Sequence, residues 1–277
     1  MNSTRISKWL TSVRGWIDPP GCETVFAPLP GDDQGCCTVG IIHEHRFAFF
    51  FWALYSLEKP NYAPRPILIT LDSHDDVGVP DEVNIDDLDD LTISNRTELG
   101  LFARMRLRRL NDGHILPALY LNFFSDVYVL INNDEEPSDF NLSYEERQQK
   151  DRYGNIHSVK YYQHINKLLQ DLPPDTPVYL DIDLDFFAIE NPEKGSLLGS
   201  ELQRPDDFIK DFLSINGPLL GPLFLRIIGL TIALEPKYCG GLLNSLNALN
   251  MLNNELFDGT LCTQACKWKM RKEVNPE

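Results

Sequence analysis

The sequence lacks any long hydrophobic run. In 277 residues the longest apolar stretch, at 47–55, is too short to span a bilayer. The opening segment, MNSTRISKWL, lacks the basic start and the apolar core of a secretory signal. We therefore expect a cytoplasmic protein with no membrane contact.

Cysteine and basic residues are also scarce. Six cysteines at irregular spacing are too few for a disulfide framework, and Cys262 and Cys266, four apart, have no matching second pair for a zinc site. The 25 Lys and Arg residues against 41 Asp and Glu residues give a formal net charge of −16. That charge excludes a nucleic-acid partner, which requires a basic footprint. It fits either a solvated acidic surface or a protein that attracts cations.

What the sequence does contain is an alternation of short apolar runs with segments of helical composition. We expect strands at 37–42, 67–71, 126–131, 178–183 and 225–234. We expect helices at 44–58, 96–110, 116–124, 143–151, 157–171, 205–213 and 240–257. The strand runs show little polar alternation, which is typical of strands covered on both faces.

This order of strands and helices predicts an α/β fold, a three-layer αβα arrangement with a mainly parallel central sheet. We expect a single domain over residues 1–277, with its core at about 38–257. The acidic run at 80–90 is interpreted as an exposed loop, and the basic end at 267–277 as a solvated tail.

Two of the expected strands end in residues that ligate metals. LDSHDD places Asp72, His74 and Asp76 at alternate positions, and LDIDLDFF does the same with Asp181, Asp183 and Asp185. Residues i, i+2 and i+4 of an extended backbone share a face and can converge on one point. A single aspartate after a strand is more often a turn former or a helix cap. Three between apolar residues would repel one another without a cation, so the pattern predicts a metal site.

The ligand types indicate which metal. Carboxylates with one or two imidazoles and no thiolate favour manganese over zinc, with iron and magnesium as alternatives. Asp72, Asp76, Asp181 and Asp183 supply four negative charges, which would balance two divalent ions. We therefore expect two Mn²⁺ per chain.

These motifs resemble those of the arginase (ureohydrolase) superfamily. LDSHDD is similar to its Asp-x-His-x-Asp motif, and LDIDLDFF to its Asp-x-Asp motif. The superfamily also places a histidine ligand at the helix start after the first strand, where IIHEHRFAFFFW offers His43 and, as the better match, His45. Its substrate-holding carboxylate near the last strand corresponds to Glu235 in GLTIALEPKYCGG. The four motifs occur in the expected order and span 38–241.

The resemblance is closer to a divergent branch, the family UPF0489. That branch shares the Glu-His helix start, the LDIDLDFF string and the Pro-x-x-Cys-Gly-Gly ending. The superfamily's usual Gly-Gly-Asp-His lead-in, and the Asp-Pro after its second motif, are absent here. Bacterial members of the branch include peptide arginases, which convert arginine side chains of ribosomally made peptides to ornithine. The resemblance implies the same activity, on an arginine-containing peptide.

The resemblance also implies roles for individual residues. Asp72 and Asp181 would bridge the two manganese ions; His45 and Asp76 would complete one site, and His74 and Asp183 the other. Asp185 and Glu44 would support the ligands from behind, and Asp185 becomes a ligand if the register shifts by two.

The implied reaction is attack of a metal-bridging hydroxide on the guanidinium carbon, with release of urea. Glu235 would pair with the planar guanidinium. His114 is the candidate proton shuttle, although a histidine at a helix start is as often structural. Asn111 and Asp112 are interpreted as caps of the helix that begins near His114.

Two other enzyme functions stay open. One is hydrolysis of a small guanidino compound such as arginine or agmatine. The other is metal-dependent deacetylation, in which the same fold uses one zinc held by an Asp-x-His motif and a later aspartate. A non-catalytic scaffold would be expected to have lost ligands, yet the full set is present.

Overall fold

The computed structural model describes residues 18–58, 65–74, 76–78, 85–107, 111–131, 147–195, 199–263 and 265–270. Within these residues, eight strands form one sheet in the order β1-β2-β10-β7-β3-β4-β6-β5. In that order their bounds are Cys22–Leu29, Asp32–Ile42, Ile227–Ala233, Val178–Asp183, Ile67–Asp72, Val127–Ile131, Ile156–Tyr162 and Arg147–Lys150. The strands from β2 to β6 in this order run parallel to one another. An antiparallel strand completes each edge, β1 beside β2 and β5 beside β6.

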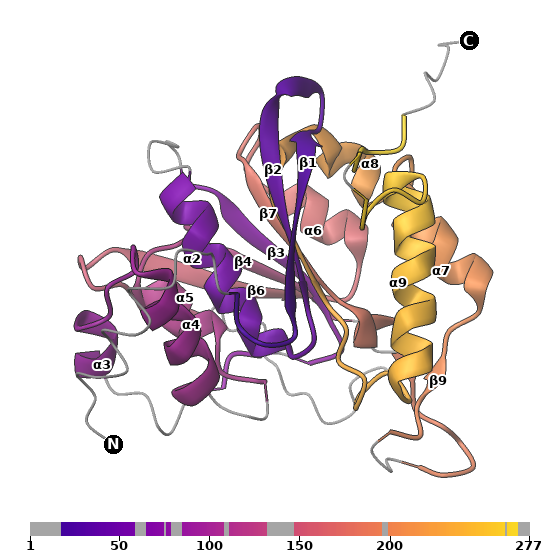
Figure 1. Cartoon of the computed structure of the whole chain (residues 1–277), viewed down its shortest axis with the longest axis horizontal. Coiled ribbons are helices and arrows are strands. Elements are labelled where there is room, and N and C mark those ends of the chain that lie inside the picture. The colour runs from indigo at the N-terminus through magenta and orange to yellow at the C-terminus, as the bar shows by residue number, and fades with distance from the viewer. Residues whose placement is uncertain are drawn as a thin grey trace.

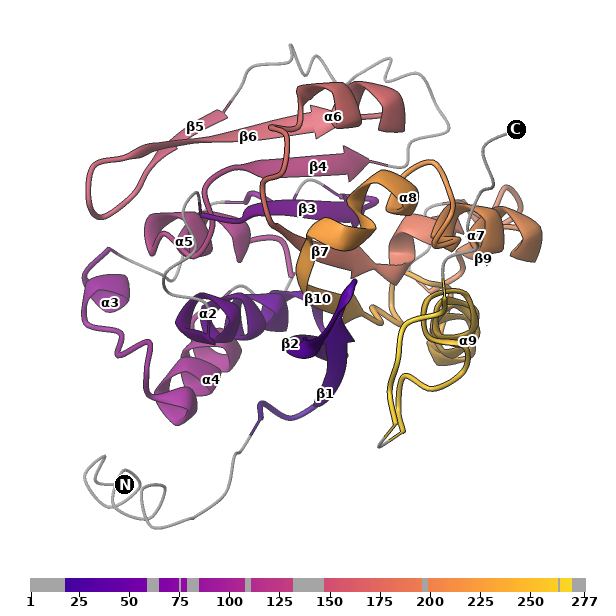
Figure 2. The same ribbon diagram turned by 90° about the horizontal axis from the view of Figure 1, so that it is seen from above.

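Helices cover both faces of the sheet (Figures 1 and 2). One hydrophobic core joins the sheet to α2 (Ala48–Glu58), α3 (Ile85–Asp89), α4 (Arg96–Met105) and α5 (Ile115–Tyr120). A second core joins it to α6 (Ile165–Asp171), α7 (Asp206–Leu213), α8 (Leu220–Leu223) and α9 (Leu242–Phe257). The molecule therefore has three layers, and the predicted α/β fold with a mainly parallel central sheet is confirmed.

Burial on both faces explains the sequence of the central strands. Every residue of β3 and of β7 is buried, so neither strand shows the polar alternation of a half-exposed strand. Helix α2 is also apolar on all sides and lies deep in its layer, with Ala48 through Tyr55 buried.

The strands β2, β10, β7 and β3 are neighbours and run parallel to one another. Their carboxyl ends therefore meet at one edge of the sheet, which is where α/β sheets bind ligands.

Part of the predicted helix at 157–171 is wrong. Residues Ile156–Tyr162 form strand β6, and helix α6 begins only at Ile165. In β6 the buried residues His157, Val159 and Tyr161 are separated by the less buried Ser158 and Lys160, which is the period of a strand. The described part of the predicted helix at 143–151 is also a strand, β5, because the polar run pairs with β6 at the sheet edge. Residues 143–146 lie outside the described part of the chain.

Three further expectations are corrected. The acidic run at 80–90 includes helix α3, held by the buried Leu88, while 80–84 lie outside the described residues. The C-terminal end is packed rather than solvated at Trp268: its ring stacks on Phe257 at 4.4 Å, and its Nε1 donates to the Pro28 carbonyl at 2.7 Å, whereas Met270 is exposed. Strand β1 was not predicted, and its Val25 extends the core beyond the expected boundary.

Two smaller features complete the frame of the site. The strands β8 (Ala188–Ile189) and β9 (Leu202–Gln203) form a separate antiparallel pair after β7. Short 3₁₀ turns, η1 (His45–Phe47), η2 (Leu184–Phe187) and η3 (Phe224–Arg226), precede α2, follow β7 and precede β10. Among the described helices, none has the length and apolar character needed to cross a bilayer.

Candidate metal centre

His45 lies at the centre of a group of carboxylates at the carboxyl edge of the sheet. It follows β2 by three residues, while Asp72 and Asp183 are the last residues of β3 and β7. The His45 Nδ1 atom lies 2.7 Å from Asp76 Oδ2, 3.0 Å from Asp183 Oδ2 and 3.2 Å from Asp72 Oδ2. All four side chains are buried. Carboxylates from two other chain segments, the end of β3 with its loop and the end of β7, therefore converge on one imidazole nitrogen.

Two overlapping sets of ligand atoms can each hold an ion. One comprises His45, Asp72 and Asp183, and the other Asp72, His74 and Asp185; within each set the ligand atoms lie within 4.8 Å of one another. In the second set the His74 Nδ1 atom lies 3.0 Å from Asp185 Oδ2 and 3.5 Å from Asp72 Oδ1. Asp72 belongs to both sets, which is the geometry of a carboxylate shared between two ions.

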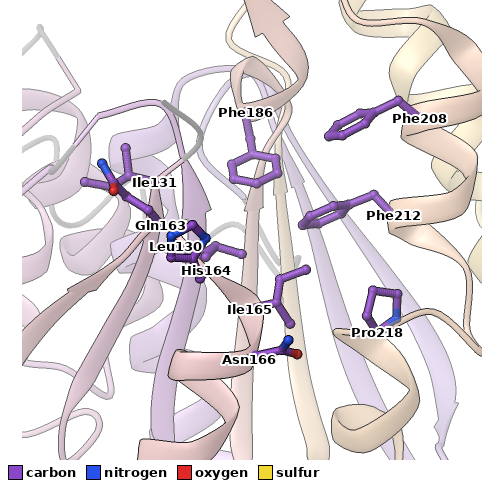
Figure 3. Close-up of a pocket in the computed structure, with 10 residues that line it drawn as sticks. All are labelled: Leu130, Ile131, Gln163, His164, Ile165, Asn166, Phe186, Phe208, Phe212 and Pro218. Carbon is purple, nitrogen blue, oxygen red and sulfur yellow. The ribbon is translucent and has the colours of Figure 1, made fainter. Parts of the chain in front are cut away.

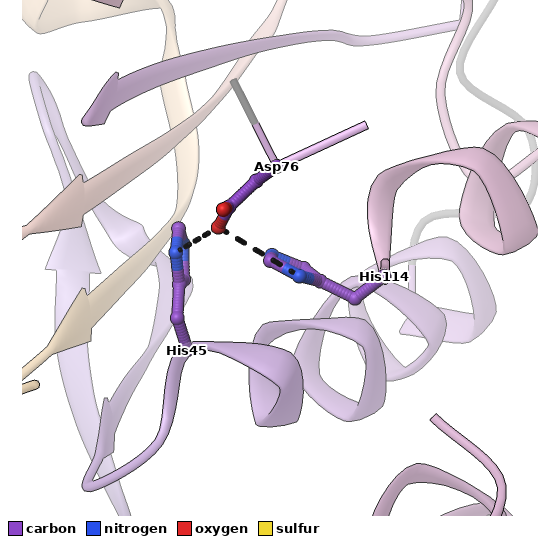
Figure 4. A group of neighbouring side chains, drawn as sticks. All are labelled: His45, Asp76 and His114. Atoms are coloured by element: carbon purple, nitrogen blue, oxygen red, sulfur yellow. Dashed lines mark ion pairs between the residues drawn. The ribbon is translucent and has the colours of Figure 1, made fainter. Parts of the chain in front are cut away.

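Asp76 and His114 form a third arm of the group (Figure 4). The Asp76 Oδ2 atom lies between His45 Nδ1, at 2.7 Å, and His114 Nδ1, at 3.9 Å. The backbone at Asp76 is left-handed, with φ 46°, a conformation that aspartate tolerates better than most residues. With His45 these two residues form another possible ligand set.

His114 is held as a neutral imidazole behind Asp76. Its ring is fully buried, stacks on Trp52 at 5.2 Å and meets the His45 ring edge-on at 4.4 Å. Burial, assisted by the nearby His45, lowers the pKa of His114 well below its usual value. Neither ring nitrogen has a hydrogen-bond partner of normal geometry. A neutral imidazole in this place can bind a metal or accept a proton, although the ring does not line the cavity described below.

Asp181, predicted as a bridging ligand, lies beneath the group instead. Its Oδ2 atom lies 2.7 Å from His45 Nε2, the ring nitrogen that faces away from the other carboxylates. Thr70 donates to the same oxygen at 2.8 Å, and Thr231 donates to Oδ1. Asp181 therefore orients the imidazole, as carboxylates behind metal-binding histidines do. The structure places Asp185 in the ligand set that carries His74, so the register of the motif is shifted by two.

The end of strand β7 explains this shift. Asp181 is in register with Thr70 of β3 and Thr231 of β10, so its neighbours on both sides are strands. It lies two residues, roughly 7 Å, inside the sheet edge. After Asp183 the chain enters the turn η2, in which the Asp183 carboxylate accepts from the Asp185 N–H at 3.0 Å. The turn brings Asp185 back over the edge toward His74.

Glu44 does not support the ligands as predicted. Its carboxylate pairs with Arg46 Nη2 at 2.5 Å, and its side chain is 39% exposed. His43, the alternative to His45, is exposed and lies outside the group. Of the three residues that follow β2, only the third, His45, is buried.

The buried polar atoms of the group fit divalent cations. His45 Nδ1, Asp72 Oδ2 and Asp185 Oδ2 are buried and lack a hydrogen-bond partner of normal geometry, which native interiors rarely tolerate. Burial, together with the charge of a neighbouring carboxylate, raises the pKa of Asp76 and of Asp183 well above the usual range. Cations would supply the missing partners and offset the repulsion.

The donor set also fits the metal expected from the sequence. Four carboxylates, those of Asp72, Asp76, Asp183 and Asp185, can balance two divalent ions. The other donors are imidazoles, a combination that suits manganese. The nearby thiol of Cys239 donates instead to the Leu234 carbonyl at 3.2 Å, and it belongs to none of the sets.

A cavity of about 320 Å³ opens onto the group, and Glu235 lines it. Glu235 follows β10 by two residues and is buried in a left-handed conformation, with φ 35°. Burial raises its pKa to about 7, although the hydrogen bond from the His45 backbone N–H opposes this effect. The residue predicted to hold the substrate cation therefore faces the same space as the ligands.

A second cavity, of about 380 Å³, continues from the first. The two share His74, Asp185 and Tyr238, and the second is bordered by strand β8 and by Glu190 and Glu201. The Tyr238 ring packs against His74 with centroids 5.3 Å apart. The site is therefore an extended space with the ligands at one end.

Sequence reasoning missed or misassigned several site residues. Asn111 and Asp112 do not cap helix α5, whose N-cap is His114 with no side-chain capping bond. Instead both residues line the first cavity, and Asn111 Nδ2 donates to Glu235 Oε1 at 2.6 Å. Thr70 and Thr231 were also missed. Each is a buried polar residue inside an apolar strand, a signal that the sequence carries.

A third cavity, of about 420 Å³, lies between α6 and α7 (Figure 3). Phe186, Phe208 and Phe212 form its aromatic wall, and Phe186 comes directly after Asp185 in η2. None of the ligand sets borders this cavity in the described part of the chain. The turn η2 therefore has an acidic side facing the ligands and an aromatic side facing this groove.

No family model and no curated protein sequence matches the chain. The resemblance to arginases therefore rests on the sequence motifs.

Proposed function

We propose that the protein is a manganese-dependent peptide arginase, which hydrolyses arginine side chains of a ribosomally made peptide to ornithine and urea. The observation that carries this proposal is the convergence of His45, Asp72, His74, Asp183 and Asp185 in two ligand sets that share Asp72. A buried carboxylate, Glu235, lines the cavity that opens onto these ligands. This arrangement suits hydrolysis of a guanidino group: two adjacent metal sites would activate water, and Glu235 would bind the positively charged substrate group.

The residues of the chain would act in distinct ways. When bound, two divalent cations lower the pKa of water and so supply a nucleophile near neutral pH. Asp181 holds the His45 ring so that Nδ1 faces the ligand set. Glu235 receives the planar guanidinium and fixes its carbon in place. His114, kept neutral by burial, is available to accept a proton at a ring nitrogen.

The overall reaction balances without another reactant. One water adds to the guanidino carbon, and the bond between that carbon and the side-chain nitrogen breaks. Urea leaves, and the nitrogen that remains on the side chain takes up a proton to become the ammonium of ornithine. The ligand residues other than His74 are almost fully buried, so bulk water has little access to the reacting atoms.

The second cavity supports a substrate larger than free arginine. It provides about 380 Å³ beyond the ligands, and Glu190 and Glu201 border it. Neither carboxylate has a cationic partner in the part of the chain that the structure describes, and Glu201 Oε2 is buried without a hydrogen-bond partner. A basic peptide would place its chain there, with the arginine side chain pointing to the ligands. We also propose a cytoplasmic location, because six cysteines at irregular spacing are too few for the disulfide framework of a secreted protein.

The decisive experiment is mass spectrometry of an arginine-containing peptide incubated with the protein and Mn²⁺. We expect a loss of about 42 Da per converted arginine, the change when a guanidino carbon leaves as urea. Asp183→Asn should abolish the change, because it removes a ligand. The matched control Asp90→Asn alters an exposed aspartate outside the site and should leave conversion intact.

Other results would redirect the proposal. Urea release from free arginine or agmatine, with peptides unchanged, would keep the chemistry and replace the substrate. Binding of one zinc per chain with hydrolysis of acylated amines would favour a deacetylase. Bound metal without activity on any guanidino compound would overturn the arginase proposal.

A further inference from the structure

Glu235 is held by two donors that both use the same oxygen. The His45 backbone N–H and the Asn111 Nδ2 group donate to Oε1, the latter at 2.6 Å. Its other oxygen, Oε2, accepts no hydrogen bond from a described residue. The carboxylate is therefore fixed in orientation, with one oxygen left for a ligand in the cavity.

Asn111 has an oxygen without a partner beside that carboxylate. The residue is 7% exposed and lines the cavity, and its Oδ1 atom is buried with no hydrogen-bond partner. The assignment of nitrogen and oxygen follows from the contacts. Because Glu235 Oε1 also accepts the His45 N–H, the atom that faces it has to be the donor, Nδ2. A buried acceptor left unmatched is costly, which indicates that a donor occupies this place in the working protein.

The backbone holds Asn111 in this position. Its φ is 64°, a left-handed conformation that asparagine tolerates better than other residues with a side chain. The segment that follows is tied to the loop of Asp76, since Gly78 donates to the Asp112 carbonyl at 2.6 Å and Val77 bridges Gly113. The amide thus belongs to the same rigid wall as the ligand loop.

We propose that Asn111 determines specificity, its Oδ1 acting with Glu235 Oε2 as a pair of acceptors for the N–H groups of a guanidinium or amidinium ion. This inference rests on the proposed function and names the feature of the substrate that the site reads. A guanidinium presents up to five N–H donors in one plane and can reach two acceptors. An alkylammonium has compact tetrahedral donors, and an acylated amine has one N–H, so neither matches the pair.

The test measures binding of methylguanidinium and of methylammonium to the full-length, Mn²⁺-loaded protein by calorimetry. Asn111→Gly removes the amide, and glycine adopts a φ of 64° without strain. We expect it to weaken methylguanidinium binding about tenfold and to leave methylammonium binding unchanged. The matched control is Asn122→Gly, at a φ of 60° outside the site, which should change neither. With an arginine peptide the Asn111 variant should raise KM more than it lowers kcat.

The outcomes separate this inference from the proposed function. If the wild-type protein and Asn111→Gly both prefer methylguanidinium equally, Asn111 is not a specificity residue and the proposed function survives. If Asn111→Gly weakens both ligands to the same extent, its role is structural and the inference is overturned. If the wild-type protein itself shows no preference for methylguanidinium, the inference and the proposed function fall together. Metal content and thermal midpoint, measured on each variant, show that the fold is retained.

Discussion

The two aspartate-rich segments use the same spacing but end differently in space. At the end of β3, Asp72 and His74 belong to the ligand sets, and Asp76 contacts the same His45 nitrogen and forms a set with His45 and His114. In the second segment Asp183 and Asp185 reach the ligand sets, while Asp181 is enclosed by Thr70 and Thr231. The first segment begins at its strand's last residue, whereas the second begins two residues earlier. An aspartate at or beyond the carboxyl end of its strand can therefore be a ligand, whereas one two residues inside the sheet orients a ligand from behind.

The largest expected effect follows from the carboxylate shared by both sets. Asp72→Asn should reduce bound manganese from two ions per chain to less than one, because the set with His45 and Asp183 and the set with His74 and Asp185 each lose a member. Activity should fall by about a thousandfold or more, since the nucleophile depends on the metal. Elemental analysis and peptide conversion measure the two effects. If the variant kept two bound ions and full activity, Asp72 would not be a ligand shared by the two sets.

A paired substitution within the second segment sharpens the comparison directly. Asp185→Asn should lower the number of bound ions by one, because it removes a ligand of the set that includes His74. Asp181→Asn should keep two ions at saturating manganese but weaken metal affinity by about 10–100-fold, as expected for a residue behind a ligand. Manganese titrations followed by elemental analysis distinguish the two variants. The reverse ranking would restore the register predicted from the sequence.

The smallest expected effect concerns the threonines that enclose Asp181. Thr231→Val removes the donor to Asp181 Oδ1 and leaves a buried carboxylate oxygen unmatched. The free energy of unfolding should fall by about 1–2 kcal/mol, with a smaller loss of metal affinity than Asp181→Asn causes. Denaturant titration is the measurement, and Thr263→Val, at an exposed threonine, is the control. Equal effects of the two threonine variants would mean that Thr231 does not hold Asp181.

The misassigned helix at 157–171 shows where local patterns failed. The residues Tyr161, Ile165 and Leu168 share a helical face when read as one run, yet they belong to two elements. Strand β6 forms because β4 on one side and β5 on the other supply its hydrogen bonds. Strand β4 is distant in the chain, and β5 is a polar run without the pattern of a strand. Neither partner can be inferred from residues 156–162, so periodicity alone favoured the helix.

Asn111 illustrates the same limit within the site. In the sequence it is a turn residue before a helix, for which capping is the common role. Its partner Glu235 lies 124 positions away, and the contact exists only because the loop after β10 and the loop before α5 meet over the ligands. No local pattern relates these two residues.

By itself the sequence determined the alternation of buried strands and helices, and hence the layered α/β fold with its mainly parallel sheet. It also placed His45, the LDSHDD residues and the LDIDLDFF residues at strand ends, because apolar runs and their polar termini are local features. The tertiary structure alone decided which aspartate of LDIDLDFF passes the sheet edge, and which amide faces Glu235. The reason is that a period of two marks a face of a strand but not the height at which neighbouring strands end.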